Sequence, residues 1–222
     1  AKDSDKIIRR IFRDQKEIDA NGIDYSGIGA LKLLPGDMKF KDVNGDGVIN
    51  TKDRTVIGNP TPDFTYGGTI SVAYKGFDIG VDVGGVYGNQ IYRNWAGTES
   101  PFQRVNYAAF IEKRWHGEGT SNWVPILGTD HIINNQYSSY GIEDGSYFRI
   151  RNIQAGYNFA QGLASKIKAR ALRVYVNIQN PKTFKTNLGY TPEFGGSATR
   201  FGVDDAGGAI PVVTTFGLNI TF

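Results

Sequence analysis

The last twelve residues, Pro211–Phe222, alternate between two kinds of side chain, and this constrains the fold more than any other stretch. One face is mostly apolar: Val212, Thr214, Phe216, Leu218, Ile220 and Phe222. The opposite face is mostly small or polar: Val213, Thr215, Gly217, Asn219 and Thr221. A period of two predicts a β-strand with one apolar and one polar face. Such a strand suits the core of a soluble sandwich or the wall of a transmembrane β-barrel, where apolar residues contact lipid.

Composition excludes several classes of protein. The chain has 222 residues and a formal net charge of +3 with both signs scattered, which argues against nucleic acid as a partner. It has no cysteine, so no disulfide framework is expected. The sequence contains no run of about 18 apolar residues, so no transmembrane helix is predicted. The opening residues lack the apolar core of a signal peptide, so we expect that one has been removed or that the chain is the later part of a longer protein.

Similar alternation predicts further strands at about 64–75, 76–87, 146–159 and 170–180, with the last at 211–222. The strand at 146–159 changes parity, which a β-bulge near Arg151–Asn152 would reconcile. Long and short connections alternate between these strands, and the long ones cover 88–145 and 181–210. Short turns at one end and long loops at the other are typical of outer-membrane barrels.

Aromatic residues gather where the strands end, as they do at the two interfaces of a membrane barrel. At the end with short turns they are Tyr74, Phe77, Tyr157, Phe159 and Phe222. At the end with long loops they are Phe64, Tyr66, Tyr87 and Tyr147. We therefore expect an all-β chain whose apolar face meets outer-membrane lipid and whose polar face lines a lumen.

Residues 42–53 have the spacing of an EF-hand calcium loop. Oxygen side chains fall at positions 1, 3, 5, 9 and 12, and a glycine at position 6 permits the sharp turn. The expected ligands of one structural Ca²⁺ are Asp42, Asn44, Asp46, the Val48 carbonyl, Asn50 and Asp53. Asp53 stands where EF-hands have a bidentate glutamate, which suits weaker extracellular sites. The alternative is an Asn/Asp/Gly turn without metal.

The remaining segments predict no catalytic machinery. An apolar stripe with basic flanks predicts a short helix at 5–19. His116 and His131 are isolated, and no nucleophile–base pair or phosphate loop is recognisable, so an enzyme is not expected. Three tryptophans of the long loop could stack on sugar rings or pack the loop on itself: Trp95, Trp115 and Trp123.

Several stretches together resemble the C-terminal end of SusC/RagA-like TonB-dependent transporters. They are Gly36–Phe40 leading into Asp42–Asp53, Ile57–Phe64, Tyr74–Asp78, Arg114–Thr120, and Gly145–Asn152 with Gly156–Tyr157. The end of the chain also resembles the assembly signal of bacterial outer-membrane proteins, through Thr215, Gly217, Ile220 and Phe222. The resemblance covers nearly the whole chain.

This resemblance implies a plugged, 22-stranded antiparallel barrel that imports oligosaccharides or other large nutrients, such as peptides. It also implies a SusD-like surface lipoprotein as a lid, and energy from the TonB complex through an N-terminal part absent here. Residues 1–63 would form an extracellular loop region, and 64–222 would form barrel strands with extracellular loops and a periplasmic C-terminus. The strands would close with the remainder of the same barrel. The alternative function is a calcium-stabilised extracellular adhesion or carbohydrate-binding module.

Overall fold

The computed structural model describes residues 8–30, 32–95, 109–128, 130–193 and 200–222. The chain divides into two compact units. One unit comprises Ala1–Gly58 and Tyr92–Ile142 and is called the loop unit below. The other comprises Asn59–Ile91 and Glu143–Phe222 and is called the sheet unit. The loop unit is therefore assembled from two segments that the first strands of the sheet unit separate in the sequence.

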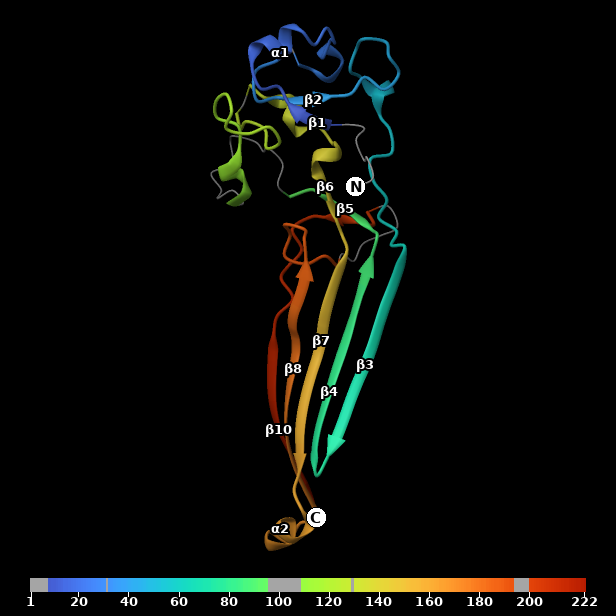
Figure 1. The fold of residues 1–222 in the computed structure, drawn as a ribbon, viewed down its shortest axis with the longest axis vertical. Helices are drawn as coiled ribbons and strands as arrows, with labels where there is room; N and C mark the ends of the chain where they lie inside the picture. The colour runs from blue at the N-terminus through green and yellow to red at the C-terminus, as the bar shows by residue number, and fades with distance from the viewer. Residues whose placement is uncertain (1–7, 31, 96–108, 129, 194–199) are drawn as a thin grey trace. The chain divides into compact units, whose positions relative to one another are not determined.

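The sheet unit is built on five long antiparallel strands in the order β10-β8-β7-β4-β3 (Figure 1). Their bounds are β3 Phe64–Tyr74, β4 Phe77–Tyr87, β7 Tyr147–Asn158, β8 Ala171–Lys185 and β10 Val213–Thr221. Lys75 and Gly76 link β3 to β4, both with positive φ (47° and 91°), as a two-residue hairpin turn requires. The short helix α2, Gln161–Lys166, links β7 to β8 at the same end of the sheet.

The register places the two kinds of residue on opposite faces. One row crosses the sheet through Val72, Ile79, Ala155, Val176 and Phe216. The next row crosses it through Ser71, Gly80, Gln154, Asn177 and Thr215. Because directly paired residues share a face, the first row belongs to an apolar face and the second to a polar face. Large side chains of the apolar face are exposed, so no described part of the chain covers that face.

Two irregularities interrupt the ladder. Asp82 pairs with Asn152 and Val83 pairs with Ile150, so Arg151 is the extra residue of a bulge, as the change of parity predicts. A second irregularity lies on β8 at Asn180–Pro181, where Asn180 has a φ of 52°. The expectation that this strand ends at residue 180 is wrong: Asn-Pro marks a bulge, and pairing resumes through Lys182–Lys185.

The aromatic residues at the strand ends contact one another on the apolar face. Near the short turns, the rings of Phe77 and Tyr157 are 4.3 Å apart between centroids. At the other end, Phe64 stacks on Tyr87 at 5.3 Å. Tyr147 also lies at this end, as the first residue of β7, but its position in the ladder puts it on the polar face, where it is buried. On the apolar face Phe148 lies beside it in sequence, with its ring 5.9 Å from that of Phe184.

The loop unit consists of short elements. Strand β1, Ile8–Ile11, pairs antiparallel with β2, Met38–Phe40, and helix α1 covers Gln15–Asp19. The 3₁₀ turns cover Ser26–Ile28, Thr51–Asp53, Ala109–Lys113, Ile132–Asn135 and Ser139–Gly141. The predicted helix at 5–19 is wrong over its first half. Residues Ile8–Ile11 instead form strand β1, which pairs with β2. Asp14 is the N-cap of α1 and accepts a hydrogen bond from the Glu17 amide, so the helix begins only after Asp14.

Three very short strands are β5 Gln90–Arg93, β6 Ile142–Asp144 and β9 Val203–Asp204, in the sheet order β6-β5-β9. Of the helices in the described ranges, none combines the length and the apolar composition needed to span a membrane.

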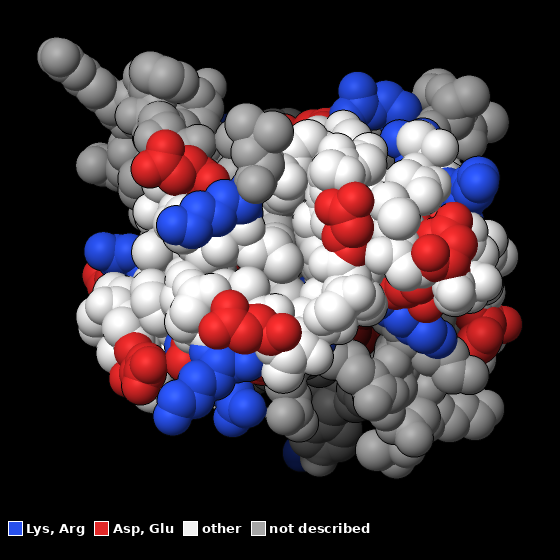
Figure 2. Space-filling view, turned by 90° about the horizontal axis from the view of Figure 1, so that it is seen from above, with Lys and Arg blue, Asp and Glu red and all other residues white. Residues whose placement is uncertain are grey.

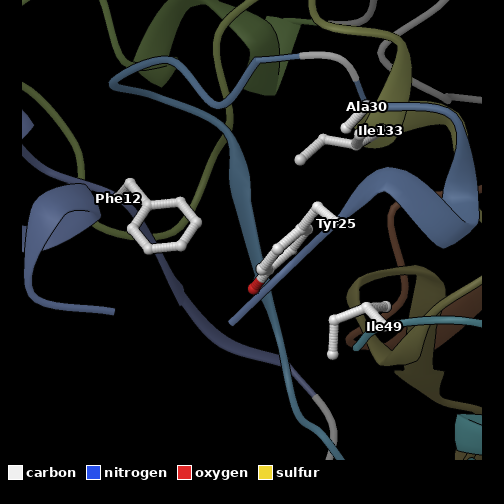
Figure 3. Close-up of a cluster of buried hydrophobic side chains, with 5 residues drawn as sticks. All are labelled: Phe12, Tyr25, Ala30, Ile49 and Ile133. Carbon is white, nitrogen blue, oxygen red and sulfur yellow. The ribbon is translucent and has the colours of Figure 1, made fainter. Parts of the chain in front are cut away.

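The loop unit has a conventional hydrophobic core (Figure 3), which comprises Phe12, Tyr25, Ala30, Ile49 and Ile133. Phe12 and Tyr25 meet edge to face, with centroids 6.0 Å apart. The buried Tyr25 hydroxyl accepts a hydrogen bond from the Phe40 amide at 3.0 Å, which ties the core to β2. Burial raises the pKa of this hydroxyl, so it stays protonated. The core joins residues from both sequence segments of the unit.

Candidate functional site

The loop at 42–53 is folded by its own carboxylates. Asp42 accepts hydrogen bonds from the amides of Gly45 (2.6 Å) and Gly47 (2.8 Å), which closes the sharp turn. At the other end, Asp53 accepts from the amides of Asn50 and Val43, both at 2.8 Å. The Asn50 amide holds the pKa of Asp53 below its usual value, with the Val43 amide contributing to the same effect.

One residue of the loop anchors it in the core of the loop unit. Val48 forms a parallel bridge with Asp24, and the Ile49 amide donates to the Asp24 carbonyl at 2.8 Å. This pairing turns the Ile49 side chain inward, where it is 3% exposed. Gly27 lies against this segment, and a Cβ there would come within 2.5 Å of the Ile49 carbonyl. The oxygen-bearing residues on either side of Ile49 are therefore held on a fixed support.

The donor set of this loop suits a hard cation. The twelve residues 42–53 contain three carboxylates, two side-chain amide oxygens and the Val48 carbonyl. Ca²⁺ binds oxygen ligands of these types. A carboxylate oxygen that accepts one amide hydrogen keeps a further lone pair. In the described part of the chain, however, no group of three or more His, Cys, Asp or Glu residues is arranged to hold a metal ion. The geometry as it stands is that of hydrogen-bonded turns.

The three tryptophans do not form a common surface. Trp115 is partly buried against the loop that contains Gly36, where a Cβ would come within 2.7 Å of its ring. Trp123 is half exposed and its ring lies 5.7 Å from that of Tyr140. Trp95 is partly buried near the end of β5. No contact between these three rings is found among the described residues.

A buried polar cluster that sequence reasoning did not find lies in the loop unit. Asp37, 1% exposed, contacts His131 Nδ1 at 2.6 Å and also accepts from the amide of Leu34 at 2.8 Å. Asn134 donates to Asp37 at 3.3 Å and accepts from the Met38 amide at 2.8 Å. The cluster holds residues more than ninety positions apart in sequence. In the sequence, His131 is the one residue of this cluster that stands out, and its position does not reveal that Asp37 is its partner.

The polar face of the sheet carries its own charged pair. Arg173 on β8 donates two hydrogen bonds to Asp78 on β4, at 2.6 and 2.8 Å. Gly156 on the intervening strand leaves room for this pair, because a Cβ there would come within 2.4 Å of the guanidinium. Thr69 donates to Asp82 at 2.7 Å further along the same face. The face therefore offers charged and hydroxyl groups to water or solute.

Near the ends of β7 and β8, a second charged cluster ties the loop that follows β8 to the sheet. Arg149, which is buried, contacts Glu193 at 2.6 Å and donates to Thr183 at 2.8 Å. The Tyr147 hydroxyl also donates to Glu193. This cluster fixes the loop that follows β8. Elsewhere the surface carries both signs of charge, and Figure 2 shows acidic and basic side chains interspersed on the face it draws.

The terminal strand lies at the edge of the sheet. Thr215, Gly217 and Ile220 pair with Asn177, Tyr175 and Leu172 of β8. The Tyr175 ring on β8 leaves no room for a side chain at position 217, because a Cβ there would come within 2.0 Å of the ring. Phe222 follows the last paired residue and is exposed. The faces of Thr215, Gly217 and Ile220 agree with the alternation of the sequence.

Comparisons with known proteins agree with this architecture. No protein-family model matches the chain. TonB-dependent receptor P3 of Formosa agariphila is 34% identical over 197 residues, covering 85% of this chain and 19% of that protein. The TonB-dependent receptor SusC of Bacteroides thetaiotaomicron is 28% identical over 192 residues, covering 85% of this chain and 18% of that protein. The chain thus spans about a fifth of the length of these relatives.

A solved structure of the RagAB peptide importer in its open-open state matches the fold. It has a TM-score of 0.67 and 22% sequence identity, and the match covers 90% of this chain and 22% of that chain. The antiparallel sheet of the sheet unit is therefore a piece of a barrel of this type. The matched proteins are receptors and transporters, which are not enzymes, in agreement with the expectation from the sequence. The chain belongs to the TonB-dependent receptors, and SusC is among the receptors to which it is similar.

Proposed function

We propose that this chain is a segment of a TonB-dependent outer-membrane transporter that imports large nutrients. The observation that supports this most is the pair of faces on the sheet unit. The apolar face carries exposed side chains such as Phe216 and Ile70, whereas the opposite face carries the Arg173–Asp78 pair. In a membrane barrel the first face meets lipid and the second lines the lumen. Among the described residues, the edge strands β3 and β10 each pair on one side only, so the other side would pair with the remainder of a 22-stranded barrel.

The direction of the barrel follows from its connections. The short turns would lie on the periplasmic side together with the end of the chain, and the loop unit would lie outside the cell. A SusD-like lipoprotein would cap the extracellular side, and the TonB complex would act through a part of the receptor outside these 222 residues. The matched RagAB protein is a peptide importer, which supports peptides as a substrate class, and oligosaccharides are the other class that the sequence resemblance implies. Trp123, half exposed, is the tryptophan best placed to contact a solute.

The soluble alternative, an adhesion or carbohydrate-binding module, requires the apolar face to be covered. Figure 1 draws the five strands as a single layer, and the described residues leave Ile70, Leu218 and Phe216 exposed on it. An exposed apolar surface of that extent in water would promote aggregation. The membrane function is therefore the better supported of the two.

The experiment is fractionation of the full-length receptor in its host, followed by extraction. We expect it in the outer-membrane fraction, soluble only with detergent, with the heat-modifiable gel migration of a folded barrel. We also expect a lipoprotein encoded with it to co-purify. Recovery of folded full-length receptor from detergent-free buffer would contradict the proposal.

We further propose that residues 42–53 bind one structural Ca²⁺ through Asp42, Asn44, Asp46, the Val48 carbonyl, Asn50 and Asp53. The support is the donor set and its anchoring through the buried Ile49. Binding would offset the repulsion of the three carboxylates and order the loop, so the ordered loop would brace the extracellular rim near the lid. Ca²⁺ takes six to eight oxygens at about 2.3–2.6 Å, so water would complete its shell.

Chelator titration followed by limited proteolysis tests the calcium proposal. In the full-length receptor, chelation should expose the 42–53 segment to cleavage, and Ca²⁺ should restore protection. Asp46→Ala should remove the effect of Ca²⁺, whereas Asp19→Ala in α1 should preserve it. Protection that does not respond to chelator would exclude the ion. Loss of the ion in Asp46→Ala with undiminished lipoprotein binding would exclude the bracing role alone.

A further inference from the structure

The two short connections of the sheet unit are uniformly basic. Lys75 lies in the turn between β3 and β4, and three more basic residues, Lys166, Lys168 and Arg170, follow one another at the end of α2. Neither connection contains aspartate or glutamate. All four side chains are exposed, and none forms an ion pair with another described residue. Four unneutralised positive charges therefore project from one end of the sheet.

The two connections are adjacent. The amide of Asn158, the last residue of β7, donates to the Gly76 carbonyl at 2.8 Å, so the second connection begins beside the first turn. Figure 1 shows α2 beyond the same ends of the strands as this turn. The basic groups thus belong to one rim of the sheet rather than to two distant sites.

This rim is amphipathic. Ala164 and Ala169 are buried where α2 packs back on the strands, while Leu163 and Ile167 are exposed beside the lysines. The Lys75 ammonium lies 5.2 Å from the centre of the Tyr74 ring, which belongs to the apolar face. Basic side chains beside exposed apolar ones are typical of a segment that lies in the headgroup region of a membrane.

An apolar groove on the adjoining face begins next to this rim. It has a volume of about 330 Å³ and is lined on the apolar face by Phe77, Ala155, Tyr157, Val174, Val176 and Phe216. The small Ala155 forms its floor between larger neighbours in the same cross-strand row, Ile79 and Val176. Phe77 and Tyr157 stand only one to two residues from the two connections. The groove therefore runs from the basic rim along the outward-facing surface.

We propose that this rim and groove together bind one anionic phospholipid, with its phosphate on Lys75, Lys166 and Lys168 and an acyl chain in the groove. The proposal rests on the proposed function, which puts the apolar face in lipid and this rim at the inner surface of the outer membrane. The charge of the rim selects an anionic headgroup. The groove adjoining it selects a ligand that carries a hydrocarbon chain on the same molecule, which a free phosphate or a soluble acidic protein lacks.

The lysines should account for the preference for an anionic headgroup, and the groove should account for retention of the acyl chain. A basic residue near an anionic lipid surface strengthens binding about fivefold. Replacing three lysines should therefore weaken binding of anionic lipid by at least about tenfold, allowing for incomplete additivity. Ala155→Phe should fill the groove without changing the charge of the rim.

The test uses the full-length receptor in detergent micelles with either phosphatidylglycerol or phosphatidylethanolamine, and native mass spectrometry counts the bound lipids. The first variant is K75Q/K166Q/K168Q. Its matched control is K16Q/K32Q/K113Q, which removes three exposed lysines of the loop unit. Heat-modifiable migration is measured for every variant, so a failure of barrel folding, which would count against the proposed function, is separated from a failure of lipid binding.

We expect the wild type and the control to retain phosphatidylglycerol in preference to phosphatidylethanolamine, and the first variant to lose that preference. Ala155→Phe should release both lipids faster. Three results would overturn the inference in a folded receptor: equal retention of the two lipids by the wild type, unchanged phosphatidylglycerol binding in K75Q/K166Q/K168Q, or displacement of the lipid by millimolar inorganic phosphate alone. Loss of a co-purifying protein, with lipid binding unchanged, would assign the rim to that protein instead.

Discussion

The two units of this chain differ in where their apolar side chains lie: the loop unit buries them, and the sheet unit exposes them. In the loop unit, Phe12 is completely buried and packs with Tyr25 and Ile133. In the sheet unit, Phe216 is 81% exposed, in a row of aliphatic and aromatic residues that no described element covers. Both units obey the same rule, that apolar surface avoids water. The loop unit therefore supplies its own core, whereas the sheet unit, under the proposed function, buries its apolar face in lipid.

The polar groups follow the same division. The loop unit buries an Asp37–His131–Asn134 cluster whose members hydrogen bond to one another and to the backbone. The sheet unit instead keeps its Arg173–Asp78 pair on a face that is only partly buried. A polar group buried within protein must have partners, whereas a polar group facing a lumen can use water. Substitutions in the two units should therefore have different consequences for stability.

The largest difference is expected when the same change is made in both units. Phe12→Ala removes a buried ring from the loop unit and should lower its stability by about 3–5 kcal/mol, because a cavity remains. Phe216→Ala should lose only the transfer of one side chain into lipid, roughly 1.5–3 kcal/mol, because acyl chains refill the space. Proteolysis of the receptor in increasing urea measures the first, and folded fraction in bilayers measures the second. If Phe12→Ala and Phe216→Ala lowered the protease resistance of the loop unit equally, the two units would not differ as described.

A charge placed on either face of β8 tests the sheet unit alone. Val176→Arg puts an arginine on the apolar face near the middle of the strand and should cost about 2–4 kcal/mol of insertion. Asn177→Arg, on the neighbouring residue, should cost well under half as much because its side chain faces the polar side. The yield of heat-modifiable receptor reports both. A larger loss for Asn177→Arg would reverse the register.

Glycine at the terminal strand gives a smaller effect. Gly217→Ala would place a methyl group against the Tyr175 ring and should cost about 1–3 kcal/mol, as overpacking does. The double variant with Tyr175→Ala should recover most of that loss, since the contact is then absent. We expect slower assembly of the barrel and an unchanged loop unit. Failure of the second substitution to rescue assembly would show that the glycine acts in some other way.

The smallest effect concerns pH and the loop at 42–53. The Asn50 amide lowers the pKa of Asp53 in the folded state, so its contribution to stability is fully present above the ordinary value of 3.8. That contribution is lost as the pH falls through the lower, folded value. The protection factors of the Asn50 and Val43 amides, which are their exchange rates corrected for the intrinsic rate at each pH, should therefore fall below about pH 4. Asp53→Asn should flatten this dependence, and an identical acid response in the variant would assign the effect elsewhere.

The fold of the sheet unit could be predicted because its signal is local. Alternation in 64–87 and 211–222 reports which face a residue takes, and the pairing of the strands then follows from short turns such as Lys75–Gly76. The bulge at Arg151 was also visible as a change of parity. By contrast, Asn180–Pro181 has the composition of a loop, and only the pairing of Phe184 with Phe148 reveals that β8 continues.

The loop unit was less predictable for a physical reason. Its core joins Phe12 and Ile133, and its polar cluster joins Asp37 and His131, across a gap of more than ninety residues. No periodicity encodes such contacts. The stripe at Ile7–Phe12 fits a helix as well as a strand, and pairing of Ile11 with Met38 decides between them. The calcium-type spacing at 42–53 is visible in the sequence because all of the expected donors lie within twelve residues, and binding of Ca²⁺ there stays a prediction.

Cysteine accessibility at two neighbouring positions of β8 distinguishes the lipid-facing side of the sheet from the lumen-facing side. The chain has no cysteine, so Val176→Cys and Asn177→Cys can be made one at a time in the full-length receptor on a cysteine-free background. In intact outer membranes, a charged, membrane-impermeant maleimide should label Asn177→Cys from the lumen and leave Val176→Cys unlabelled. A nitroxide on a lipid chain should quench a fluorophore at position 176 more than one at 177. Labelling of Val176→Cys with protection of Asn177→Cys would contradict the assignment of the two faces.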